Sequence, residues 1–107
     1  MKVINLTPHD VNICDDYGHI IKTYKTSGII ARVANGFETI DYVDGTPIVC
    51  RTNERIVNLP EPEEDTVYIV SNVILDYCLD RMDLLAPVQQ VRINGQVVGC
   101  RSFMSNR

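Results

Sequence analysis

Residues Leu59–Pro87 read LPEPEEDTVYIVSNVILDYCLDRMDLLAP, and they contain the clearest change of pattern in the 107-residue chain. Thr66–Val70 is a run of strand-favouring residues without polar and apolar alternation, which is typical of a strand covered on both faces. Ser71 follows directly and is a good N-cap, because its hydroxyl can accept from an otherwise unpaired backbone N–H. We therefore predict a central strand at Thr66–Val70 and a helix that begins near Asn72.

The predicted helix has one polar stripe. On a helical wheel of about 100° per residue, four polar residues share a narrow face, namely Asn72, Asp76, Asp80 and Asp83. We expect the side chains of this stripe to be exposed to solvent and the other side chains of the helix to pack against the rest of the protein. Arg81 projects into the apolar part, and two interpretations remain open. In the first, its aliphatic chain covers apolar surface while its guanidinium contacts the helix C-terminal carbonyls. In the second, its guanidinium lies at the edge of a pocket and binds an anion.

The length and charge of the chain restrict its class. A chain of 107 residues fits a single domain, 1–107, that can bury a core without metal or disulfide staples. The net charge of −4 argues against non-specific nucleic-acid binding, which needs a basic surface. No apolar run approaches a membrane span, and the first residues are too short for a signal segment. We expect a cytoplasmic protein that contacts neither nucleic acid nor membrane.

The four cysteines are widely and irregularly spaced, at Cys14, Cys50, Cys78 and Cys100. No C-x-x-C pair is present, and each cysteine stands beside apolar residues. This pattern favours buried free thiols. A disulfide pair is one alternative, and a zinc site is another, although structural zinc sites usually carry at least one close ligand pair. We expect no metal and no cofactor.

Turn motifs divide the chain into hairpins. Asp15–Gly18 has the Asp and Gly placement of a β-turn and should join Val11–Cys14 to His19–Lys25. Asn35-Gly36, Asp44-Gly45 and Asn94-Gly95 are strong two-residue hairpin signals. The first two would pair Ala34 with Phe37 and Val43 with Thr46. The resulting meander would have a core face of Ile29, Ala31, Val33, Ile40, Tyr42, Pro47 and Val49.

These elements together predict an α+β fold. It is mainly antiparallel β, a meander or small barrel built from hairpins, with one helix inserted before a C-terminal hairpin. The acidic connector Pro60–Asp65 should be a solvated loop. The tail from Met104 should be frayed.

Two places could bind a ligand. The Asn94-Gly95 register puts Arg92, Gly99, Arg101 and Phe103 on one strand face, which would offer bidentate donors, room for close approach and a stacking surface to a phosphate or nucleotide. A solvated strand face is the alternative. At Ser71 and Asn72 a strand meets a helix N-terminus, where free N–H groups either bind an anion or are simply capped.

His9 beside Asp10 is the one candidate for acid–base chemistry, with Ser71 or a cysteine as nucleophile. A hydrogen-bonded turn explains the same residues. No G-x-S-x-G, H-E-x-x-H, P-loop or G-x-G-x-x-G motif is present. We therefore expect no catalytic residues, and a small hydrolase is the least favoured class.

Several segments carry a resemblance to a known family. They are NLTPHDVNI at Asn5–Ile13, SGIIARV at Ser27–Val33, LPEPEEDTVYIVS at Leu59–Ser71, R-x-DLLAP at Arg81–Pro87 and VVGCRSF at Val97–Phe103. In these segments the chain resembles small proteins encoded by phages and prophages. The resemblance implies an accessory protein that acts in the cytoplasm of an infected host cell, by binding a host factor or by capturing a nucleotide signal of host defence.

Two functional hypotheses follow. In the first, a non-enzymatic binder sequesters a nucleotide-like anion through Arg92, Arg101, Phe103, Ser71, Asn72 and Arg81. In the second, the chain is an interaction module or inhibitor of a host protein, and the acidic Glu61–Asp65 segment mimics an anionic partner surface. A homo-oligomer is compatible with either, since a small sheet with open edges invites pairing.

Overall fold

The computed structural model describes residues 1–107 and shows an α+β fold that is mainly antiparallel β. The strands are β1 (Lys2–Asn5), β2 (Val11–Cys14), β3 (Ile20–Tyr24), β4 (Arg32–Val43), β5 (Thr46–Val57), β6 (Thr66–Ile69), β7 (Leu84–Ile93) and β8 (Gln96–Met104), and the helix is α1 (Asn72–Tyr77). The predicted fold class is confirmed, with the helix placed before the C-terminal β7–β8 hairpin. Six residues of helix are far too few to cross a bilayer.

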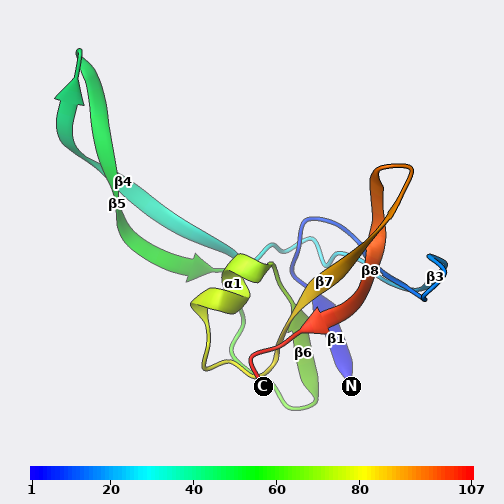
Figure 1. Cartoon of the computed structure of the whole chain (residues 1–107). Helices are drawn as coiled ribbons and strands as arrows, with labels where there is room; N and C mark the ends of the chain where they lie inside the picture. The colour runs from blue at the N-terminus through cyan, green and yellow to red at the C-terminus, as the bar shows by residue number, and fades with distance from the viewer.

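Six strands form one sheet in the order β1-β6-β7-β8-β2-β3. Strand β6 lies between β1 and β7, pairs with both in parallel, and is buried along its whole length, as the sequence predicted. The two outer strands approach each other, because Asn5 at the end of β1 forms a parallel bridge with Thr26 just after β3. The sheet is therefore curled toward closure. We call this sheet together with α1 the body (Figure 1).

The core of the body lies where β6 meets α1. Tyr68, Leu6, Ile74, Leu75 and Leu84 are almost fully buried in one cluster. A smaller cluster on the other side of β6 contains Val11, Ile69 and Cys100. The unbroken apolar run of β6 thus supplies side chains to both sides of the sheet, which explains why it shows no alternation.

The helix begins where the sequence predicted but ends earlier. Ser71 is the N-cap, and its hydroxyl accepts from the Ile74 amide across 3.4 Å. The last helical residue is Tyr77, so Asp80 and Asp83 lie outside α1. The expectation that everything beside the polar stripe packs is wrong, because several apolar residues are exposed, namely Val73, Tyr77, Leu79 and Met82.

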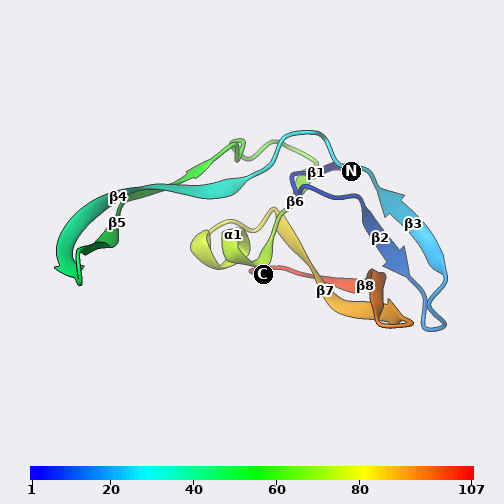
Figure 2. The same ribbon diagram turned by 90° about the horizontal axis from the view of Figure 1, so that it is seen from above.

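Strands β4 and β5 form a separate two-stranded sheet of twelve residues each, which we call the arm. It projects away from the body and curves along its length (Figures 1 and 2). The Asp44-Gly45 turn is confirmed by the pairing of Val43 with Thr46. The predicted Asn35-Gly36 turn and the meander are wrong.

The chain passes straight through Asn35-Gly36 because this dipeptide takes part in a β-bulge. The register shifts between Ala34 and Gly36, and Gly36 pairs with Thr52. Asn35 lacks the positive φ that a two-residue hairpin turn requires, whereas Asp44 has φ 49° and Asn94 has φ 53°. An Asn-Gly pair satisfies either geometry, and the long-range pairing with β5 decides between them.

Candidate protein interaction surface

The arm exposes large apolar side chains along its outer half. Phe37 is 71% exposed, Ile40 62% and Tyr42 64%, and none of the sixteen buried residues of the protein lies in β4 or β5. The predicted core face is therefore wrong for this segment, since only Ala31 is buried and Val33 is half-buried. A two-stranded sheet without a covering layer presents both faces to water.

One face of the arm is predominantly apolar. Paired residues of an antiparallel ladder share a face, and successive residues alternate. Tyr42 pairs with Pro47, Thr39 with Val49, and Phe37 with Arg51, so these six residues share one side of the arm. We call this side the aromatic face. It runs from the turn, where Tyr42 lies, toward the body, where Phe37 lies beside Arg51.

Charge is unevenly distributed along the arm. The outer segment, residues 38–50, contains Glu38, Asp41 and Asp44 and no basic residue. The inner segments, residues 32–37 and 51–57, contain three arginines and one acid, namely Arg32, Arg51, Arg55 and Glu54. The tip of the arm is therefore acidic and its base is basic.

The base of the arm adjoins α1 at two open clefts. One, of about 260 Å³, is lined by Val33, Arg51, Val73 and Tyr77 among others. The second, of about 350 Å³, is lined mainly by apolar side chains and includes Arg32. Across the first cleft the Tyr77 hydroxyl donates to the Glu54 carboxylate and so ties the helix to the arm.

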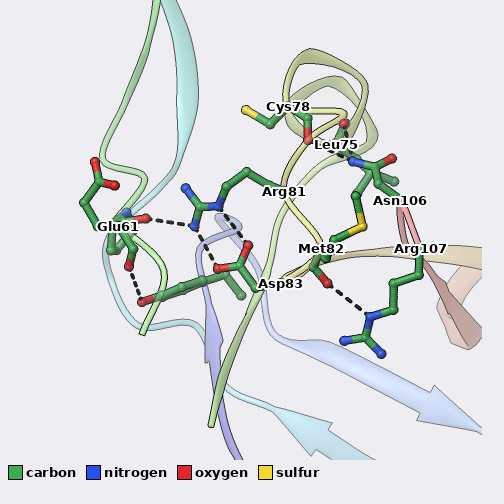
Figure 3. A network of polar contacts seen from close by, with 10 residues as sticks. Glu61, Leu75, Cys78, Arg81, Met82, Asp83, Asn106 and Arg107 are labelled. Carbon is green, nitrogen blue, oxygen red and sulfur yellow. Dashed lines mark hydrogen bonds and ion pairs between the residues drawn. The ribbon is translucent and has the colours of Figure 1, made fainter. Parts of the chain in front are cut away.

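The chain leaving the arm is held firmly to the body by Arg81 (Figure 3). Its Nε and Nη2 each donate to the Asp83 carboxylate at 2.8 Å, and Nη2 also donates to the Pro60 carbonyl at 2.9 Å. The hydrogen bonds from Arg81 hold the pKa of Asp83 below its ordinary value, and the same pair raises the pKa of Arg81. Arg81 therefore orients the start of the acidic connector.

The C-terminal tail contacts the carbonyl end of α1 and the turn that follows it. Asn106 Nδ2 donates to the carbonyls of Leu75 and Cys78 at 3.0 Å each, and Arg107 Nε donates to the Met82 carbonyl (Figure 3). The expectation of a frayed tail is wrong for these residues, because Asn106 caps the carbonyl end of α1.

Comparison with protein-family models, curated proteins and solved structures finds no match.

The predicted ligand residues of the β7–β8 hairpin each contact a different part of the protein. Arg92 donates weakly to the Gly95 carbonyl and to Gln90 near the turn. Arg101 lies against the β2–β3 turn, with Nη1 3.9 Å from an Asp16 carboxylate oxygen. Phe103 is half-buried and packs on Tyr24, with ring centroids 5.9 Å apart.

The Asn94-Gly95 turn is confirmed, but the predicted face beyond it is not. A bulge between Val91 and Arg92 shifts the register by one residue, so Gly99 lies opposite Val91 and not on a continuous face with Arg92. Gly99 instead faces β2, where an added Cβ would lie 2.6 Å from the Asn12 carbonyl oxygen.

The residues predicted around α1 are engaged within the fold. Ser71 caps the helix, Asn72 is its exposed first residue, and Arg81 is bound to Asp83 and Pro60. Neither interpretation of Arg81 describes its contacts, because it lies beyond the helix and its guanidinium holds a carboxylate of the same chain.

The NLTPH segment forms a hydrogen-bonded turn. The buried Asn5 side chain donates to the carbonyls of His9 and Tyr24 and accepts from the Thr7 amide and hydroxyl. Asp10 accepts from the Thr26 amide at 2.8 Å, while the His9 side chain is exposed. These hydrogen bonds fix the conformation of the β1–β2 connection, and this structural role explains the residues of the motif.

The largest cavity, about 420 Å³, lies between β2 and the β7–β8 hairpin, where His9, Asp10 and Gln90 contribute to its lining. That lining contains one carboxylate and no lysine or arginine. The cysteines are free, and burial raises the pKa of the Cys78 and Cys100 thiols, which disfavours the thiolate form. The expectation of buried thiols holds for Cys14 and Cys100.

The aromatic face is the surface that the sequence-based interpretation missed. Part of its signal was present in the spacing, since Asp44-Gly45 joins two long strand-favouring segments, but the Asn35-Gly36 turn signal within the first segment obscured it. Strands of twelve residues exceed the usual 3–10, so their length alone sets this hairpin apart from the strands of the body.

Proposed function

We propose that this protein is a non-enzymatic binding protein that acts through protein–protein contact, with the arm as its contact element. The observation that carries the proposal is the exposure of Phe37, Ile40 and Tyr42 on a hairpin without a covering layer. Exposed apolar patches of several hundred Å² on a small protein usually mark interaction surfaces. Tyrosine, phenylalanine and arginine, which make up much of the aromatic face, are enriched in interface cores.

The anchoring of the arm supports this role. The arm is tied to the body by the Tyr77–Glu54 hydrogen bond, by the Asn58 side chain on the Ile30 carbonyl, and by Arg81 on Pro60. A contact element that is held in one direction loses less conformational entropy on binding than a flexible loop. The body therefore acts as a platform that presents the arm.

Site-specific photo-crosslinking tests the proposal. A benzoylphenylalanine replaces Phe37 in the full chain, and the matched control carries it at Tyr17, an exposed aromatic residue of the β2–β3 turn. In cells that express the protein, the arm position should give a covalent adduct to a protein, and the control should not. Absence of any protein adduct from the arm would contradict the proposal.

The acidic connector is a separate candidate for the same kind of contact. Glu61, Glu63, Glu64 and Asp65 are exposed in the connector that leads from the arm to β6, where an Asp65 carboxylate oxygen lies 3.4 Å from the N-terminal amine. Converting these four residues to their amides should leave the arm adduct intact if the arm carries the contact. Loss of the adduct in that variant would transfer the role to the connector.

A second candidate is the capture of a nucleotide-like anion, such as a signal of host defence, in a protein of phage type. It is favoured by Arg101, whose side chain is 47% exposed and whose contacts to Asp16 are long, at 3.5 and 3.9 Å. Native mass spectrometry of the purified protein would reveal a retained ligand. An Arg101→Ala variant should lose such a ligand, and equal retention would remove Arg101 from the site.

A further inference from the structure

The shape of the protein indicates that the arm is incomplete by itself. Its radius of gyration is 17.3 Å, whereas a compact chain of this length has about 13 Å. The excess comes from the arm, which projects away from the body (Figure 2) and packs against the core only at its base, through the half-buried Val33 and Ile56. An isolated two-stranded hairpin is at best marginally stable in water, so the outer arm requires a covering surface.

We propose that this covering surface is the arm of a second copy of the same chain. Two copies pack their aromatic faces together in an antiparallel arrangement with two-fold symmetry. The proposal rests on the proposed function and names the partner of the contact.

The residues of the aromatic face are complementary to themselves in this arrangement. An antiparallel two-fold contact brings the tip of each arm to the base of the other. Tyr42 of one copy then lies over Phe37 and Arg51 of the partner arm, and the reverse contact forms as well. Aromatic pairs and arginine over an aromatic ring are both favourable contacts in a desolvated interface.

The charge distribution favours the same arrangement. Arg51 is the charged residue of the aromatic face, and Asp44 lies in the turn at the tip. The antiparallel arrangement brings Asp44 of each copy toward Arg51 of the other, whereas Glu38 and Asp41 lie on the opposite face of the arm. A parallel arrangement would bring acid to acid and base to base. Charges within about 10 Å still interact at physiological salt, so the antiparallel arrangement is selected over the parallel one.

The aromatic face supplies part of the area that a dimer needs. Its exposed apolar side chains include Phe37, Tyr42 and Val49, whereas Val43 and Ile48 lie on the opposite face of the arm. The two aromatic side chains present on the order of 300 Å², given that one aromatic side chain has about 150–250 Å². Stable interfaces bury about 800 Å² per partner, and the clefts beside Val33 and Val73 at the arm base can supply the remainder.

Analytical ultracentrifugation of the full chain tests the proposal. The wild type should sediment as a dimer, and the F37S/Y42S variant should weaken dimerisation by on the order of a hundredfold or more, since buried aromatic anchors dominate interfaces. The matched control is Tyr17→Ser. These residues are exposed in the single chain, so thermal melting of the variants should remain cooperative. A monomeric wild type, or a variant that dimerises as tightly, would overturn the proposal.

Charge reversal gives a second, independent test. The acid-reversed variant D44K and the base-reversed variant R51E should each dimerise about tenfold or more weakly, because the tip and the base of the contact then carry the same sign. An equimolar mixture should recover dimerisation, since both tip-to-base contacts are again opposite in sign. Recovery also shows that both variants are folded. E63K/E64K in the connector is the control, and weakened variants without recovery would overturn the antiparallel arrangement.

Different results would overturn the arm as a contact element and the self-association of the chain. A monomeric purified protein whose arm still crosslinks to another protein in cells would overturn self-association and leave the arm as a contact element. A crosslinked species with twice the mass of the chain would support both. A monomeric protein without any adduct would overturn both.

Discussion

At Gly99 the chain passes closer to a neighbouring strand than any side chain would permit. A Cβ at this position would lie 2.6 Å from the Asn12 carbonyl oxygen and 2.7 Å from Cys14 Sγ. The first contact is with backbone, so relief requires β8 to move away from β2. Gly99 therefore fixes how closely the β2–β3 hairpin joins the rest of the sheet.

A Gly99→Ala substitution should lower the free energy of unfolding by about 2–3 kcal/mol, the upper part of the range for overpacked sites. Urea denaturation measures the change. Val97→Ala on the exposed part of the same strand is the matched control and should change stability far less. A Gly99→Ala protein of wild-type stability would show that the two strands separate at little cost.

The ion pair between Asp83 and Arg81 makes the stability of the fold sensitive to acid. Because the hydrogen bonds from Arg81 lower its pKa in the folded state, the carboxylate stabilises the fold above its ordinary pKa of 3.8, and this stabilisation is lost as pH falls through the lowered value. Asp83→Asn should reduce stability at neutral pH by about 1–2 kcal/mol. The difference from wild type should shrink in strong acid.

Urea unfolding at neutral pH and below the ordinary aspartate pKa measures this effect. Asp80→Asn is the control, because it removes the same charge from an exposed position nearby. A stability difference that is independent of pH would argue that Asp83 acts by packing and not through its ion pair.

At the scale of single elements, α1 depends on residues far from it in sequence. Its N-terminus is capped locally by Ser71, which the sequence predicts correctly. Its carbonyl end is capped by Asn106, 28 residues after Cys78. The polar spacing that continues through Asp80 and Asp83 imitates a longer helix, but the Arg81–Asp83 pair lies in the turn after it. Local periodicity carries no information about such a cap.

Replacing Asn106 with Ala should leave the carbonyls of Leu75 and Cys78 without their donor. We expect a loss of about 1–2 kcal/mol and faster amide hydrogen exchange in α1. Ser105→Ala is the matched control, since its hydroxyl accepts from the Arg107 amide and not from the helix. Unchanged exchange in α1 would show that the tail does not stabilise the helix.

At the turns, too, the observed structure depends both on the local dipeptide and on strand pairing with residues far away in sequence. Asp44-Gly45 and Asn94-Gly95 form the predicted turns, and Asn35-Gly36 does not. All three dipeptides have the same local preference. At Asn35-Gly36 the chain instead gains a ladder with residues 52–57, and this pairing is not evident from a short window.

For the whole molecule, the buried part was predictable and the exposed part was not. The apolar run of β6 and the N-cap at Ser71 depend on local chemistry, so the centre of the body followed from sequence. The candidate surface did not, because apolar residues such as Ile40 and Tyr42 look identical whether they face a core or a partner chain. Arg92, Arg101 and Phe103 were placed on one face by a register that a single bulge alters.

The division into body and arm leads to a prediction for a shortened chain. Residues 37–51 are replaced by an Asn-Gly turn between Gly36 and Thr52, which pair across the ladder in the complete protein. All sixteen buried residues are retained. The shortened protein should therefore melt within about 4 °C of the wild-type monomer, equivalent to less than about 1 kcal/mol.

Small-angle scattering should show the radius of gyration of the shortened protein falling toward about 13 Å, the value for a compact chain. Ultracentrifugation should show a monomer, since the aromatic face is gone. A large loss of melting temperature in a protein that remains monomeric would instead mean that the outer arm stabilises its own body. A compact, stable and still dimeric shortened chain would place the contact on the body, at an open strand edge such as β3, because edge strands are the other surface of this fold able to pair with a second copy.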